Sequence, residues 1–154
     1  MRGNTFLFIA QGSNNWYACV MSNNEEIRKL SNYWRELSDY DMKTAEHMLQ
    51  TKRYPYCLFM CHLAVEKILK AIIVSGSGKH APYSHNLVEL AKNSKLDFDE
   101  KQKDLLADLT EFNLEARYPE WQKDFYKKAT KSYTIKYIDD SIKIHKWLKK
   151  HLQK

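Results

Sequence analysis

Glycine and proline, the residues that most often end helices and form turns, are scarce in this sequence. The 154 residues include four glycines and three prolines, whereas hydrophobic residues make up 44% and aromatic residues 13% of the chain. The hydrophobic share is ordinary for a globular protein, and the length fits a single domain. So few turn-forming positions favour long helices.

Cysteine is scarce too, and the odd count of three argues against a disulfide framework in a chain with no recognisable secretory leader. We therefore expect a reducing, cytoplasmic location. Cys57 and Cys61 lie four residues apart on one helix face, and we interpret them as small buried packing residues rather than half of a metal site. The HxxE and HxxH spacings of zinc sites are absent, so no metal and no cofactor is predicted.

Long hydrophobic runs are missing as well. The apolar run at residues 6–10 is far shorter than the roughly 20 residues that span a bilayer, so no membrane segment is expected. The polar, turn-forming stretches that follow it predict a poorly integrated extension over residues 1–24 and a helical domain over residues 25–154. Met21 is an alternative start to Met1, and N-terminal sequencing of the natively expressed protein would decide between them.

Basic charge is concentrated at the C-terminal end. The net charge is +6, but residues 1–120 hold 15 Lys or Arg against 16 Asp or Glu, whereas residues 121–154 hold ten Lys against three Asp. A basic patch of this kind suits phosphate-bearing partners. A solvated helix face that keeps the protein soluble is the alternative interpretation.

Apolar side chains recur every three or four residues along much of the chain, which predicts amphipathic helices. We expect helices over residues 25–50 and from about Pro55 to 74. A short helix should follow from a polar cap within residues 84–86 to about 93. The last two should run from a cap at Asp97 or Asp99 to just before Pro119, and over about 131–152. Residues 119–130 are interpreted as a basic, aromatic connection. The predicted class is all-α, an up-and-down helical bundle of four to five helices.

The predicted central helix, CHLAVEKILKAII, is apolar on most faces, but His62, Glu66 and Lys70 form one polar stripe at i, i+4, i+8 spacing. His62 and Glu66 could act as a base and its orienter. The alternative is a surface pair, with Glu66 forming an ion pair with Lys70. His85 fits either a helix cap or a site, and His145 lies in an apolar stripe, where we expect a core or interface histidine.

The segment EFNLEARYPEW places Arg117, Tyr118 and Pro119 at a helix end. Arginine there can bind phosphate through two parallel hydrogen bonds while Tyr118 or Trp121 stacks on a base. The alternative is a structural corner in which Arg117 satisfies the last carbonyl groups of the helix.

Four segments, in this order, resemble the HEPN domain family: YWRELSDYDMKTAEHML, CHLAVEKILKAII, SHNL and EARYP. The resemblance covers about residues 30–150. It implies an all-α bundle similar to the helical domain of kanamycin nucleotidyltransferase. Members of the family usually form homodimers and are often encoded beside a minimal nucleotidyltransferase partner. Several members of the family are toxin ribonucleases.

The ribonuclease members carry an arginine followed, after four to six residues, by a histidine, and two such motifs meet across the dimer cleft. Arg117 matches the arginine, but Gln122, Lys123 and Asp124 occupy the positions where the histidine would fall. RNA cleavage by this route is therefore not expected, and no catalytic residue is assigned.

The resemblance and the charge together predict a nucleotide- or RNA-binding domain that acts with a nucleotidyltransferase partner in a toxin–antitoxin-type system. The candidate binding residues are Arg117, Tyr118, His62, Glu66, Lys70, His85, Lys143, Lys146 and Lys150. Two alternatives stay open. One is a metal-independent toxin endoribonuclease in which His62 or His85 replaces the missing histidine, and the other is a purely structural protein-partner module.

Overall fold

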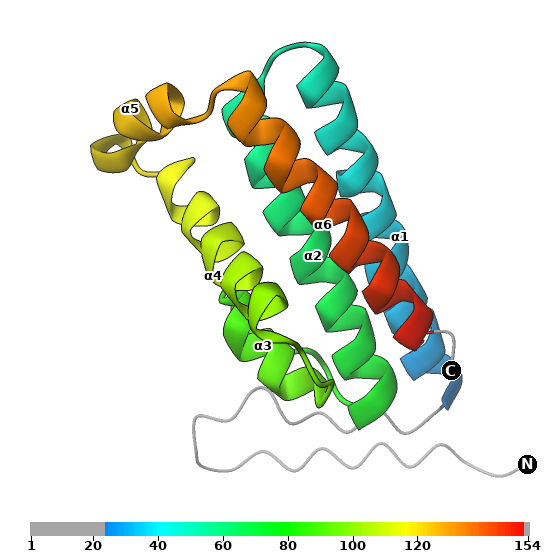
Figure 1. Cartoon of the computed structure of the whole chain (residues 1–154). Coiled ribbons are helices and arrows are strands. Elements are labelled where there is room, and N and C mark those ends of the chain that lie inside the picture. The colour runs from blue at the N-terminus through cyan, green and yellow to red at the C-terminus, as the bar shows by residue number, and fades with distance from the viewer. Residues whose placement is uncertain (1–23, 153–154) are drawn as a thin grey trace, which may run out of the picture.

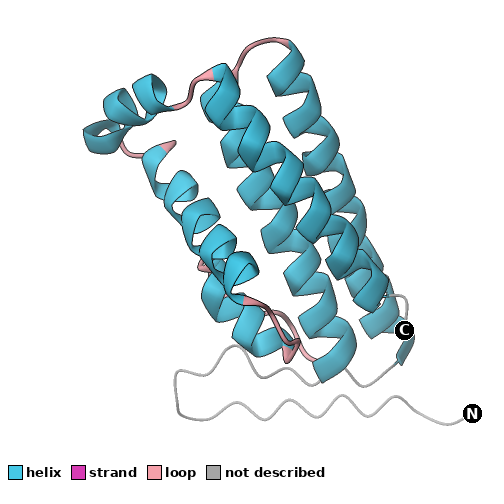
Figure 2. Cartoon of the chain, in the orientation of Figure 1, coloured by secondary structure: helices cyan, strands magenta, loops and turns pink. Residues whose placement is uncertain are grey.

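The computed structural model describes residues 24–152, which form helices and short connections without a β-strand (Figures 1 and 2). The helices are α1 (Asn24–Gln50), α2 (Tyr54–Ser77), α3 (Leu87–Ser94), α4 (Glu100–Glu115), α5 (Pro119–Lys128) and α6 (Lys131–Leu152). The all-α class predicted from the sequence is confirmed, with six helices in this part of the chain rather than four or five.

The predicted N-terminal extension lies outside the described residues, except that Asn24 begins α1. The choice between Met1 and Met21 also lies outside them. Within residues 24–152, every helix is too short or too polar to cross a membrane.

The central element is α2, which contacts all five other helices. α1 and α6 pack on one side of it, and α3 and α4 pack on another (Figure 1). Fourteen of its 24 residues are buried, including Cys57 and Cys61, which are free thiols in the core. A helix surrounded in this way must be apolar on most faces, which explains the sequence pattern.

Specific residues set the ends of the helices. Pro55 lies in the first turn of α2, where its missing N–H costs nothing, and Gly78 ends the helix in the left-handed conformation at φ 65°. Asp99 and Gln102 form a reciprocal capping box at the start of α4, with hydrogen bonds of 2.8 and 3.0 Å. Of the two aspartates predicted as caps, Asp99 is the N-cap of α4.

The connection predicted over residues 119–130 is wrong, because Pro119–Lys128 form α5. The helix has a single buried side chain, Phe125, whose ring lies 5.6 Å from that of Phe112 on α4. Ten residues are fewer than the roughly 11–18 over which hydrophobic periodicity distinguishes a helix from a connection. Short helices gain most of their stability from tertiary packing. Here the packing includes the contact between the Phe112 and Phe125 rings and the edge-to-face contact of Tyr126 with Tyr56 on α2.

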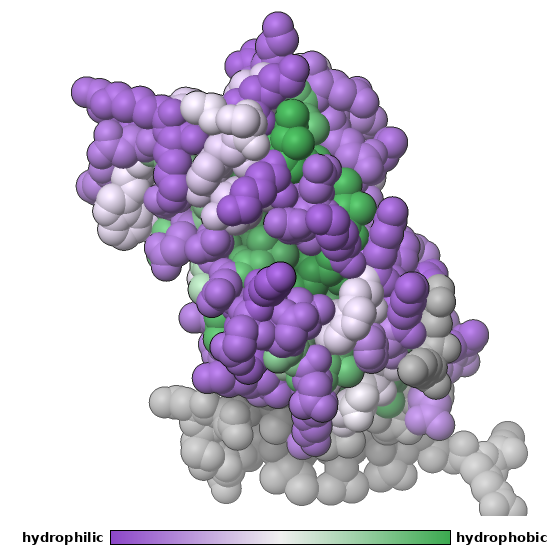
Figure 3. Space-filling model, in the orientation of Figure 1, coloured by the Kyte–Doolittle hydropathy of each residue, from purple (hydrophilic) through white to green (hydrophobic). Residues whose placement is uncertain are grey.

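α4 and α6 both pack on α2 but make few contacts with each other. A groove of about 390 Å³ lies between them, with Leu105, Ile144 and Trp147 among its lining residues and Asp140 and Lys143 beside them. Apolar side chains are visible on this face of the molecule (Figure 3). The groove between α4 and α6 is therefore a partly apolar surface with charged groups around it.

One serine hydroxyl joins three helices in the core. Ser38 of α1 donates to the carbonyl oxygen of Ala64 on α2 at 2.6 Å, and its oxygen lies 2.8 Å from Nε2 of His145 on α6. Because a hydroxyl has only one proton, His145 must donate through Nε2 to Ser38. The prediction of a core histidine at position 145 is confirmed.

Burial lowers the pKa of His145 to about 4 from an ordinary 6.5; the negative charge of Asp39 opposes this effect, and the positive charge of Lys149 adds to it. The folded protein therefore holds His145 neutral. This preference contributes stability above pH 6.5 and is lost as the pH falls from 6.5 through 4, because the unfolded chain binds the proton first.

We predict that His145→Gln removes this part of the pH dependence of unfolding. The stability of the wild type relative to the variant should fall by roughly 3 kcal/mol between pH 7 and pH 4, measured by urea unfolding at intervals across that range. His47→Gln, at an exposed position on α1, serves as the control. A wild-type advantage that stays constant with pH would contradict the prediction.

Candidate functional site

A buried carboxylate on α2 collects three hydrogen-bond donors. Oε1 of Glu66 accepts from Nζ of Lys70 at 2.7 Å, and Oε2 lies 3.0 Å from Nε2 of His62 and 3.0 Å from Nδ1 of His85. His62, Glu66 and Lys70 are only 0%, 4% and 6% exposed. The predicted His62–Glu66 contact and Glu66–Lys70 ion pair are both present, whereas the interpretation as a surface pair is wrong.

The Glu66 network, as we call these four residues, connects several helices. Nζ of Lys70 lies 5.2 Å from the centre of the Trp34 ring on α1, within the range of a cation–π contact. Nδ1 of His62 lies 2.9 Å from the carbonyl oxygen of Leu109 on α4. His85 comes from the connection that precedes α3, so the network touches four parts of the fold.

The His62 ring is held at both of its nitrogens. Nδ1 faces the backbone carbonyl of Leu109 on α4, and Nε2 faces the carboxylate of Glu66 on its own helix. The ring therefore links α2 to α4 through two polar contacts, and neither nitrogen is left without a partner in the core.

These donors decide the protonation of Glu66. Desolvation alone would raise its pKa, but hydrogen bonds from His62, Lys70 and His85 and the positive charge of Lys70 outweigh it and lower the pKa from 4.5 to about 2. The carboxylate is thus stabilised above pH 4.5, and this contribution is lost as the pH falls from 4.5 toward 2.

His85 is the member of the network that reaches solvent. Its side chain is 51% exposed, its Nδ1 faces Glu66, and its Nε2 has no hydrogen-bond partner among residues 24–152. The N-cap of α3 is Asn86, whose side chain accepts from the N–H of Glu89 at 3.0 Å. His85 is therefore a surface imidazole whose orientation is fixed by a buried carboxylate, an arrangement suited to acid–base chemistry.

The α4–α5 corner brings together an arginine and two aromatic rings. Tyr118 and Trp121 are 48% and 52% exposed, and their rings pack edge to face at 5.8 Å. Nε of Arg117 donates to the carbonyl oxygen of Asn113 at 3.1 Å, and its guanidinium carbon lies 6.0 Å from the centre of the Tyr118 ring. The arginine thus has the predicted structural role at the helix end while its side chain stays exposed.

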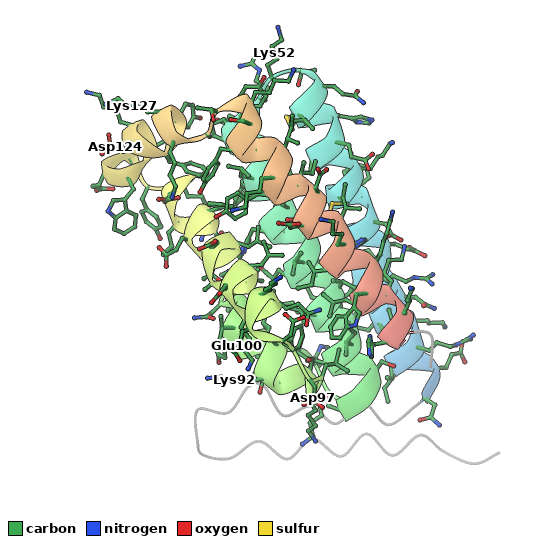
Figure 4. The ribbon with its side chains drawn as sticks, viewed as in Figure 1. Lys52, Lys92, Asp97, Glu100, Asp124 and Lys127 are labelled. Atoms are coloured by element: carbon green, nitrogen blue, oxygen red, sulfur yellow. The ribbon has the colours of Figure 1, made fainter. Side chains whose placement is uncertain are left out.

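Gln122, Lys123 and Asp124, which occupy the positions where ribonuclease relatives would have a histidine, have other roles. Nε2 of Gln122 donates to the carbonyl oxygen of Ala116 at 3.1 Å, which helps to satisfy the end of α4. Asp124 pairs with Lys127 at 3.5 Å, and both point away from the bundle on the outer side of α5 (Figure 4). No imidazole accompanies Arg117 at these three positions.

The α4–α5 corner and the Glu66 network are separate within one chain. Leu109, whose carbonyl group contacts His62, and Arg117 are eight residues apart, or about 12 Å along α4 and its last turn. The structure therefore does not gather all the predicted residues into one site.

The three predicted lysines of α6 divide between two grooves. Lys143 pairs with Asp140 at 2.8 Å and lines the groove between α4 and α6. Lys146 and Lys150 line a second groove, of about 400 Å³, between α1 and α6. These two have no acidic partner among the described residues.

Two parts of the site could not be found from the sequence. The carbonyl group of Leu109 is a backbone acceptor that any residue would supply, and Trp34 reaches Lys70 only through the packing of α1 on α2. Across residues 24–152, no cluster of three or more His, Cys, Asp or Glu side chains is arranged to hold a metal ion.

The helical bundle and its polar network define a class of small all-α domain, and comparison with known proteins gives the family. Residues 31–152 match the HEPN domain, so the chain belongs to the HEPN domain family, which suggests a nucleotide- or RNA-related function. The protein TT1696 from Thermus thermophilus has a similar crystal structure, with a TM-score of 0.69 over 79% of this chain and 97% of that one. At 17% identity this likeness concerns the fold alone. A search of curated proteins found no match.

We predict that Glu66→Gln strongly destabilises the fold, because it leaves the buried ammonium group of Lys70 without its carboxylate. Removing one partner of a buried ion pair costs about 3–5 kcal/mol, which urea unfolding at pH 7 would measure. Glu89→Gln, at an exposed position on α3, is the control and should change stability far less. A loss below about 1 kcal/mol in Glu66→Gln would show that the network does not hold the fold together.

Proposed function

We propose that this HEPN domain binds a nucleotide or single-stranded RNA. The observation that carries the proposal is the α4–α5 corner, where exposed Arg117, Tyr118 and Trp121 lie next to one another. Exposed aromatic rings stack on bases, and stacking contributes about 1–3 kcal/mol per base. An arginine beside them supplies the charge and hydrogen bonds that a phosphate requires. Lys146 and Lys150 on α6 add positive charge elsewhere on the same molecule.

The partners expected from the family resemblance are further parts of this proposal. We propose that the domain forms a homodimer and acts with a nucleotidyltransferase partner in a toxin–antitoxin-type system. The groove between α4 and α6 supports a symmetric dimer, since Leu105 and Trp147 are apolar and its charged groups have both signs. A surface with both signs can pair with a second copy of itself.

A second candidate function is supported by one observation, the Glu66–His85 pair. Fixed by Glu66 through Nδ1, His85 could use Nε2 to accept the proton of an RNA 2′-hydroxyl. The 2′-oxygen would then attack the adjacent phosphorus, and the 5′-oxygen would leave with a proton from solvent. This is the metal-independent endoribonuclease alternative, with His85 in place of the missing histidine.

The RNA-binding proposal predicts retention of labelled single-stranded RNA without cleavage, in the presence and absence of EDTA. Binding should weaken steeply between about 50 and 200 mM salt, because phosphate contacts release counterions. Trp121→Ala should reduce affinity by about tenfold or more, whereas Tyr126→Ala, an exposed ring elsewhere on α5, is the matched control. No retention at low salt would reject RNA binding and leave a protein-partner role as the better account.

The same assay tests the ribonuclease alternative. If RNA is cleaved with EDTA present, His85→Asn should slow cleavage by about 100-fold or more, the usual effect of losing a general base. Cleavage that survives this change excludes His85 as the base. Cleavage that survives Arg117→Ala excludes the α4–α5 corner as part of the cleavage site.

The proposed dimer predicts a mass of twice the 18.3 kDa chain in sedimentation experiments. Leu105→Lys should shift the protein toward monomer, because it places an unpaired charge in the groove between α4 and α6. Lys101→Ala, on the rim of the same groove, should leave the mass unchanged. A wild type that stays monomeric at high protein concentration would overturn the homodimer proposal, and co-elution with a nucleotidyltransferase would then test the other partner.

A further inference from the structure

The groove between α1 and α6 is rich in lysine. It is lined by four lysines, two carboxylates, Met42 and His145; the charged residues are Lys43, Lys146, Lys149, Lys150, Asp39 and Glu46. We call this the lysine groove. Its volume of about 400 Å³ lies within the range of small-molecule binding sites.

Both carboxylates in the lysine groove are already neutralised. Asp39 pairs with Lys149 at 2.7 Å, and Glu46 pairs with Lys43 at 2.9 Å. His145, in the wall, is neutral at pH 7 because burial disfavours its charged form. Four lysines against two carboxylates leave the groove with two positive charges in excess, those of Lys146 and Lys150.

Lys146 and Lys150 are placed to act together. They are four residues apart, so their Cβ atoms lie about 5–6 Å from each other on one face of α6. Lys150 lies in the last turn of α6, where a positive charge stabilises the helix through its dipole. This structural role is enough to explain a lysine at position 150. Lys146 lies a turn earlier, and within residues 24–152 neither lysine has an acidic partner.

We propose that the lysine groove binds the phosphate of a phosphate ester, with Lys146 and Lys150 as the binding residues. Two flexible ammonium groups one turn apart can reach the same phosphate, and a terminal phosphate carries close to two negative charges at pH 7, which matches the excess in the groove. The ester can be a nucleotide or the 5′ end of an RNA strand, since both present this group. This inference deepens the proposed function and rests on it only for the nucleic-acid identity of the ligand.

The test compares two double variants of the full chain that remove equal charge from the same helix. Lys146→Ala/Lys150→Ala empties the lysine groove of its excess charge, and Lys131→Ala/Lys136→Ala changes exposed lysines at the other end of α6. All four positions are exposed, so both variants should fold, which circular dichroism and thermal unfolding would check. Affinities are measured at about 50 and 200 mM salt for ATP, a 5′-phosphorylated RNA oligonucleotide and the same oligonucleotide with a 5′-hydroxyl.

We expect the lysine-groove variant to lose at least about tenfold in affinity at about 50 mM salt and to depend less on salt, because fewer counterions are released. The control variant should change by less than about threefold. A larger loss for ATP and the 5′-phosphorylated RNA than for the 5′-hydroxyl RNA identifies a terminal phosphate; an equal loss for both RNAs identifies internal phosphates and overturns the assignment to a terminal group.

Three other outcomes would overturn the inference. Equal losses in the two variants would mean that only net charge matters, and unchanged affinity in both would mean that the groove binds nothing. Loss in Trp121→Ala without loss in the lysine-groove variant would keep the proposed function and reject the groove. Conversely, ATP binding that requires Lys146 and Lys150 in a protein that retains no RNA would keep the groove and reject RNA binding.

Discussion

The fold depends on how α2 accommodates a carboxylate in an otherwise apolar core. Burying an isolated ion costs several kcal/mol, so Glu66 is tolerated only because His62, Lys70 and His85 direct hydrogen bonds to it. Each of these donors also fixes something else. His62 holds the backbone of α4, Lys70 packs against the Trp34 ring of α1, and His85 positions the connection that leads into α3.

A buried network of this kind is weak evidence for stability, because apolar side chains of similar volume can fill the same space at no greater cost. What it adds is a directional contact. The hydrogen bond between His62 and the Leu109 carbonyl tolerates little displacement and fixes one point of α4 against α2. The apolar side chains of α4, with Leu106, Leu109 and Phe112 buried, pack around that point.

The sequence was sufficient wherever one helix carries its own signal. The polar stripe of α2, its start near Pro55 and a cap of α4 at Asp97 or Asp99 could be read from spacing and residue type, and the structure selects Asp99. α5 could not be read in this way, because ten residues with a single buried side chain are too few for a decisive periodic pattern, and Phe125 meets Phe112 only in the packed fold. Among the α6 lysines, the pairing of Lys143 with Asp140 follows from their i,i+3 spacing on one helix. The pairing of Lys149 with Asp39 depends on packing, since Asp39 lies on α1.

The hydroxyl of Ser38 has a consequence for what the lysine groove can offer a ligand. Since Ser38 gives its only proton to Ala64, the neutral His145 ring donates its single N–H through Nε2 to Ser38. His145 therefore lines the groove without an N–H to spare for a ligand. The charged hydrogen-bond donors of the groove are the ammonium groups of its lysines, so a ligand is selected by its anionic groups.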